Sequence, residues 1–132
     1  MNISFWYQSL EKPFFAPPAE VFGIVWSILY PIIFISFGYV FYLILKDRIP
    51  SKVSIPFIVN LVANFSFSPI QFGLQNNILA MIDILIVFGS LIWAMKVIWK
   101  YSRGVAIAQI PYLLWVGFAM ILQISITWLN FK

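Results

Sequence analysis

Charged residues divide this chain into uncharged runs that are too long and too apolar for the surface of a soluble domain. The runs that lack Asp, Glu, Lys and Arg are Val21–Leu45, Val53–Ile82, Ile84–Met95 and Gly104–Phe131. Asp83 alone separates the middle pair. A helix needs about 20 apolar residues to cross a hydrocarbon core of about 30 Å. The runs therefore predict helices that span a membrane.

A turn signal divides the long middle stretch into two helices. The segment Gly73-Leu74-Gln75-Asn76-Asn77 combines glycine and asparagine, which favour turns. We therefore predict an all-α fold, a polytopic membrane bundle with four transmembrane helices in one domain. The expected helices cover about 19–46, 54–72, 77–99 and 105–129.

Composition supports this class and excludes several kinds of site. Hydrophobic residues make up 63% of the chain and charged residues 9%, whereas soluble domains have about 45–50% and about 25%. The absence of Cys and His removes disulfides, imidazole bases and the usual zinc or haem ligands. Four acidic residues make a metabolic enzyme with paired carboxylates improbable, and we expect no obligatory cofactor.

The first 18 residues differ from the rest of the chain. They combine aromatic residues with three prolines, Pro13, Pro17 and Pro18, and lack the basic and apolar regions of a secretory signal. Trp and Tyr favour the membrane interface, because their rings are apolar with one polar end. We therefore expect residues 1–18 to lie at the interface.

Basic residues predict the orientation. Three lie between the first two expected helices and three between the last two, at Lys46, Arg48, Lys52, Lys96, Lys100 and Arg103. Basic loops stay on the cytoplasmic side, so both termini should face outward, in a bacterial cytoplasmic membrane. The same rule explains the net charge of +4 without a nucleic acid partner; the lipid bilayer is the expected environment.

Three stripes of side chains mark a candidate binding region. The second helix carries an amide stripe with Asn60, Asn64, Ser68 and Gln71 within one sector. Aromatic stripes occur on the first helix (Phe22, Trp26, Tyr30, Phe34) and the last (Tyr112 and Trp115, followed by Ala119 and Leu122). Amides and aromatic rings can be interhelical packing, or they can form a pocket for a flat apolar ligand.

Asp83 is the one ionisable residue predicted to lie within a span. A carboxylate inside a membrane is a candidate functional group. Because Asp83 lies near the start of its helix, it can instead be an acid near the surface that bonds Asn or Gln, or that complements the helix dipole. We favour this structural interpretation.

Short motifs recur in a recognisable order along the chain: Trp6-Tyr7, Leu10, Lys12-Pro13, Pro17-Pro18, Val21 to Trp26, Leu29-Tyr30, Asn64, Ser68-Pro69, Phe72-Gly73, Ile82-Asp83, Pro111 to Leu113, Trp115, Phe118-Ala119 and Leu122. They resemble the TspO/MBR family, the tryptophan-rich sensory proteins related to the mitochondrial translocator or peripheral benzodiazepine receptor. The matches follow the family order along nearly the whole chain. Family members have five transmembrane helices, and the expectation here is a bundle without the first of them.

The resemblance implies a ligand pocket closed by the 1–18 segment, which would act as a lid over the outer end of the bundle. Its expected walls are Tyr7, Pro17, Phe22, Trp26, Asn64, Ser68, Trp115, Ala119 and Leu122. The implied ligands are porphyrins, including haem-type tetrapyrroles, and compounds like the isoquinoline carboxamides. Light-dependent porphyrin breakdown also occurs in some family members.

We thus expect a porphyrin sensor or translocator that acts as a receptor in the membrane. One alternative is a small dimeric exporter that uses Asp83; another is a truncated member with an oligomeric role alone. A homodimer is the simplest expected association, because small residues on the first and third helices, Ser36 with Gly38 and Gly89 with Ser90, let two backbones approach. The alternative is a monomer in which lipid fills the groove left by the missing helix.

Overall fold

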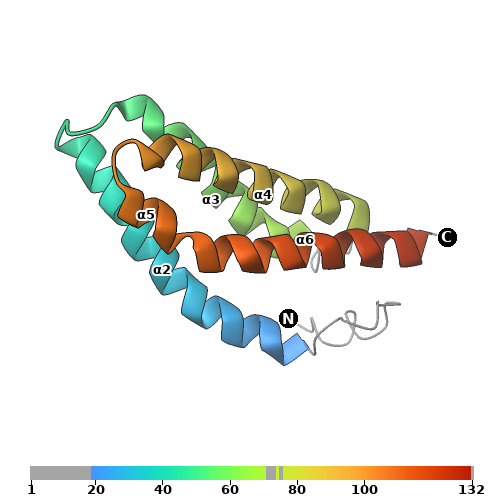
Figure 1. The fold of residues 1–132 in the computed structure, drawn as a ribbon. Helices are drawn as coiled ribbons and strands as arrows, with labels where there is room; N and C mark the ends of the chain where they lie inside the picture. The colour runs from blue at the N-terminus through green and yellow to red at the C-terminus, as the bar shows by residue number, and fades with distance from the viewer. Residues whose placement is uncertain (1–18, 71–73, 75, 132) are drawn as a thin grey trace.

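The computed structural model describes residues 19–70, 74 and 76–131, and in this part of the chain the secondary structure is helical. The elements are α2 (Ala19–Leu45), η1 (Ser51–Val53), α3 (Ser54–Ser68), α4 (Asn77–Trp99), α5 (Arg103–Ala108) and α6 (Ile110–Phe131). They form an elongated all-α bundle (Figure 1). The predicted fold class is confirmed. The expected 1–18 segment lies outside the described residues.

Three of the helical segments are long and apolar enough to cross a membrane: Glu20–Leu45, Asn77–Trp99 and Arg103–Asn130. The fourth, α3, has 15 residues and is about 22 Å long at 1.5 Å per residue. It was expected to extend to residue 72. Its α-helical hydrogen bonding ends at Ser68, a short π-type turn follows at Pro69 and Ile70, and residues 71 and 72 lie outside the described part of the chain. Pro69 lacks the N–H that would continue the ladder.

The helix expected over 105–129 is interrupted near its start. Helix α5 ends at Ala108 and α6 begins at Ile110, with Gln109 between them. Pro111 is the physical reason, because it has no N–H to donate to the carbonyl of Ile107. The expected helix thus corresponds to one candidate span, Arg103–Asn130, with a one-residue interruption at Gln109, and α4 starts at Asn77. The side chain of Asn76 caps that start by accepting from the N–H of Leu79 at 3.0 Å.

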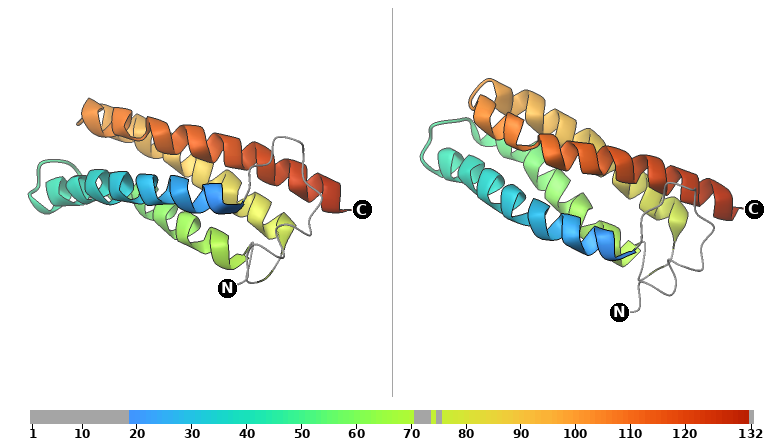
Figure 2. Two further views of the ribbon diagram at one scale, coloured as in Figure 1. Left: turned by 90° about the horizontal axis from the view of Figure 1, so that it is seen from below. Right: turned by 60° about the horizontal axis from the view of Figure 1, so that its bottom comes forward.

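Helix α4 lies in the middle of the bundle and packs against α3, α5 and α6. The core side chains that it buries almost completely include Val87, Leu91, Ala94 and Ile98. Helix α2 crosses the bundle obliquely (Figures 1 and 2) and buries Ile33, Phe37 and Val40 against it. Phe37 meets Phe57 of α3 edge to face, with ring centroids 4.8 Å apart.

The two basic connections lie at the same end of the bundle, as the views in Figure 2 show. One joins α2 to η1 and the other joins α4 to α5. The opposite end holds the end of α3, the start of α4 and the C-terminal end of α6. This grouping is the arrangement that the positive-inside rule requires, and the side of the membrane remains a prediction.

The predicted orientation can be checked with single introduced cysteines, because the chain contains no Cys. A thiol replacing Ser51 or Gly104 at the basic end should be shielded from an impermeant reagent in intact cells, and one replacing Leu74 should react. Each position is exposed, and a side chain added at Gly104 meets no other atom within 4 Å. If the cysteines at positions 51 and 104 are labelled before lysis while Leu74→Cys is protected, the orientation is the reverse of the predicted one.

Candidate functional site

The amide stripe of α3 points into the bundle. Asn60 is fully buried and Asn64 is 7% exposed. They are four residues apart and therefore lie on one face of the helix. Burial of an amide in a membrane protein requires hydrogen-bond partners. The structure supplies those partners from three other helices.

Tyr112 of α6 joins the two asparagines. Its hydroxyl accepts from Asn64 Nδ2 at 2.6 Å and donates to Asn60 Oδ1 at 2.9 Å. The side chain is fully buried. The amide nitrogen of Asn60 also donates to the carbonyl of Val87 at 3.0 Å and to the hydroxyl of Ser90 at 3.2 Å. The hydroxyl of Tyr112 thus connects α6 to α3, and Asn60 connects α3 to α4.

Tyr30 adds α2 to this network. Its hydroxyl donates to Asn64 Oδ1 over 3.4 Å, which is long for an O–H···O bond. An amide side chain offers two donor hydrogens and an acceptor oxygen with two lone pairs. Asn64 uses one donor at short range, so it retains hydrogen-bonding capacity. Tyr112 and Tyr30 were not among the expected wall residues, although both lie on the aromatic stripes.

The aromatic stripes of α2 and α6 face each other. Phe22 meets Trp115 edge to face with ring centroids 5.5 Å apart. Trp26 stacks on Tyr30 at 5.0 Å and meets Tyr112 edge to face at 6.2 Å. Such pairs contribute about 0.5–1.5 kcal/mol beyond the area they bury. The rings therefore form a continuous aromatic wall beside the amide network.

Trp115 carries a buried polar atom. Its indole Nε1 has no hydrogen-bond partner among the described residues. A buried indole N–H usually finds an acceptor. The nitrogen is thus a hydrogen-bond donor on the aromatic wall that no described residue uses.

The expected wall residues fall into three groups. Phe22, Trp26 and Trp115 make the contacts given above, and Asn64 belongs to the amide network. Ala119 is half-buried against the core, and Leu122 is 3% exposed. Tyr7 and Pro17 lie outside the described residues, as does the side chain of Ser68. Their place in a pocket stays a prediction.

Asp83 lies inside the bundle. It is 7% exposed, and its Oδ2 has no hydrogen-bond partner among the described residues. It occupies the second turn of α4, which begins at Asn77, and helix-dipole effects fall off within the first turn. The interpretation of Asp83 as an acid near the surface that the helix dipole stabilises therefore does not fit its position. The structure favours treating Asp83 as a candidate functional group.

The serines expected to form a dimer surface do not lie on the outside. Ser36 accepts from Gln109 Nε2 at 2.7 Å, and Ser90 accepts from Asn60. Both serines are buried because these polar contacts lie between helices of one chain. Gly38 and Gly89 are exposed, so of the four small residues expected at the dimer surface these two are available for close approach of a second copy.

Fold and site together define a small polytopic helical membrane protein in which aromatic and amide side chains line the space between helices. The chain belongs to the TspO/MBR family, whose profile matches residues 1–129. It is 34% identical to the tryptophan-rich protein TspO of Archaeoglobus fulgidus over 98% of this chain and 82% of the relative. It is also 32% identical to the human translocator protein, over 89% of this chain and 70% of the relative.

Proposed function

We propose that this protein binds a porphyrin or a related tetrapyrrole within the bundle and acts as its sensor or translocator. The aromatic wall built from Phe22, Trp26 and Trp115 beside Asn64 supports the proposal most directly. Flat apolar ligands suit a site with many aromatic surfaces and a few orienting polar groups. Membership of a family that includes translocator proteins supports the same function.

In this proposal the indoles of Trp26 and Trp115 contact the faces of the macrocycle. Asn64 orients a polar edge through the capacity that Tyr112 and Tyr30 leave unused. The indole N–H of Trp115 donates to a ligand carboxylate or carbonyl. A compound of the isoquinoline-carboxamide type would use the same aromatic surface and the same two polar groups.

Titration of protoporphyrin into the purified protein, followed by tryptophan quenching, tests the proposal. Trp26→Leu and Trp115→Leu should each raise the dissociation constant about five-fold or more, because losing one aromatic contact costs about 1 kcal/mol. Trp128→Leu is the matched control, since Trp128 also lies on α6 but is 70% exposed. Unchanged binding by the first two folded variants would refute this site.

A second candidate function is export coupled to Asp83, which the burial of this carboxylate favours. Efflux of a fluorescent cation from liposomes should then disappear in Asp83→Asn. If the wild type shows efflux and Asp83→Asn retains it, Asp83 does not couple export. If the wild type binds porphyrin but shows no efflux, the protein is not an exporter.

We also propose that the protein forms a homodimer, for which the exposed glycines of α2 and α4 are the basis. Closed two-fold symmetry is the commonest form of self-association. Photobleaching of fully labelled protein at low density in liposomes should show two steps. One-step bleaching throughout would establish a monomer.

A further inference from the structure

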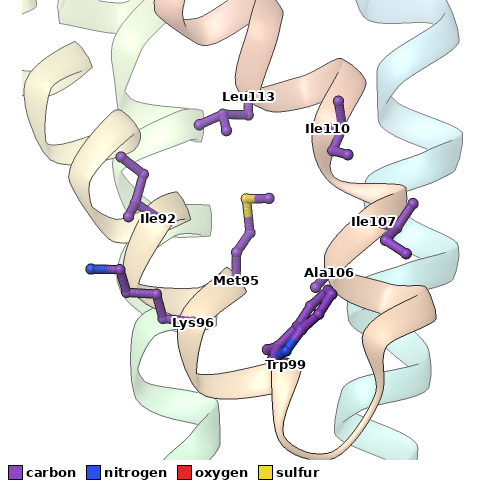
Figure 3. A pocket seen from close by; sticks show the side chains of 8 residues that line it. All are labelled: Ile92, Met95, Lys96, Trp99, Ala106, Ile107, Ile110 and Leu113. Carbon is purple, nitrogen blue, oxygen red and sulfur yellow. The ribbon is translucent and has the colours of Figure 1, made fainter.

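A groove lies at the basic end of the bundle, between α4 and the α5–α6 segment, with a volume of about 310 Å³. Figure 3 shows Met95, Trp99, Ile107, Ile110 and Leu113 around it, with Lys96 at one side. None of the residues expected to bind porphyrin lines this groove. It is therefore separate from the aromatic wall.

The groove opens to the outside of the bundle. Trp99, Ile107 and Ile110 are between 44% and 54% exposed, whereas Ala106 on its floor is buried. An outer surface at this depth faces lipid if the helices span the membrane. An acyl chain is therefore the molecule that meets the groove first.

An apolar surface alone does not select one lipid over another, because the acyl chains of all surrounding lipids are equally apolar. Selection requires a polar group at the mouth. Lys96 lines the groove with its methylene groups, and in Figure 3 its ammonium points away from Trp99. The guanidinium of Arg103 lies over the Trp99 ring, 5.1 Å from the centroid. These two cations border the apolar surface.

The surrounding charge is also positive. Lys100 is exposed between the two helices that form the groove, and no Asp or Glu occurs after Asp83 in the sequence. The other connection at this end contributes Lys46, Arg48 and Lys52 against one acid, Asp47. An anionic group thus meets several cations and little opposing charge.

We propose that this groove binds an anionic phospholipid, with an acyl chain along Met95, Trp99 and Ile110 and the headgroup phosphate at the border of the groove that carries Lys96 and Arg103. Basic pockets between transmembrane helices suit phosphate-bearing headgroups. The site distinguishes lipids by headgroup charge and holds them by packing. It does not depend on the function proposed for the aromatic wall.

Brominated lipids test this site, because bromine quenches nearby indole fluorescence. The protein is placed in phosphatidylcholine vesicles that contain a small fraction of dibromo-phosphatidylglycerol or dibromo-phosphatidylcholine. We expect stronger quenching by the anionic lipid, and the excess should disappear in Trp99→Phe. Lys96→Gln and Arg103→Gln should each raise the amount of anionic lipid needed for half of the excess about five-fold.

Lys52→Gln is the matched control, because it removes one exposed positive charge from the same end of the bundle but outside the groove. It should leave the excess unchanged, and Lys96→Gln should leave protoporphyrin affinity unchanged. Equal quenching by the two lipids, an excess that persists in Trp99→Phe, or an equal effect of Lys52→Gln and Lys96→Gln would overturn the proposal.

Discussion

Tyr112→Phe should lower the free energy of unfolding by about 1–3 kcal/mol, which is the cost of leaving a buried polar group unpaired. The substitution removes one oxygen and keeps the ring. That oxygen accepts from Asn64 Nδ2 and donates to Asn60 Oδ1. Its loss deprives two amides in the bundle interior of a partner. Interhelical hydrogen bonds in membrane proteins average about 0.6 kcal/mol, so a larger effect here would reflect the loss of this partner by both Asn60 Oδ1 and Asn64 Nδ2.

Reversible unfolding in mixed micelles measures this change. Tyr101→Phe is the matched control, because its side chain is 44% exposed near the basic end. It should shift the unfolding free energy by less than about 0.5 kcal/mol. If Tyr112→Phe also shifts the unfolding free energy by less than about 0.5 kcal/mol, the hydroxyl of Tyr112 contributes no measurable stability.

Asp83→Asn should have the opposite effect from Tyr112→Phe and raise the free energy of unfolding by about 1–3 kcal/mol. An Asp at the centre of a transmembrane helix costs about 2.5–3.5 kcal/mol on insertion scales, and less near the interface. Oδ2 of Asp83 has no partner among the described residues to offset that cost. The substitution removes the charge and keeps the shape.

The same unfolding assay applies, with Asp47→Asn as the control. Asp47 is exposed and has a φ of 57°, a conformation that Asn also tolerates, so its substitution should be neutral. A gain in stability for Asp83→Asn together with lost porphyrin binding or efflux would mark a group retained for function. A loss of stability would mean that the carboxylate has a structural role.

The helices themselves follow from the sequence, because lipid offers no hydrogen bonds to the backbone. An apolar run of sufficient length must satisfy its peptide groups internally, and a helix is the way to do so within one segment. Asn76 and Ser102 mark the starts of α4 and α5 as side-chain caps. The π-type turn at Pro69 and the break at Gln109 were not predicted, although Pro69 and Pro111 are visible in the sequence. A proline within a membrane helix can be accommodated or can end it, and neighbouring helices decide between these outcomes.

The sequence predicts the candidate site only as separate stripes of side chains, each on one helix. Helical periodicity shows that Asn60 and Asn64 share a face, and amides are too polar to face lipid. Periodicity could not identify Tyr112, 48 residues beyond Asn64 along the chain, as the group that joins them. It also could not place Ser36 and Ser90 inside the bundle, because a small residue on a helix suits an internal contact as well as an external one.

The sequence by itself determined that the chain forms membrane helices, which connections carry positive charge, and which residues share a helical face. These properties depend on run length, composition and the 3.6-residue period. The tertiary structure alone decided how the helices are rotated and crossed. That packing pairs Tyr112 with both asparagines, buries Asp83 and forms the groove beside Lys96, because each of these features is made by side chains from helices that only packing brings together.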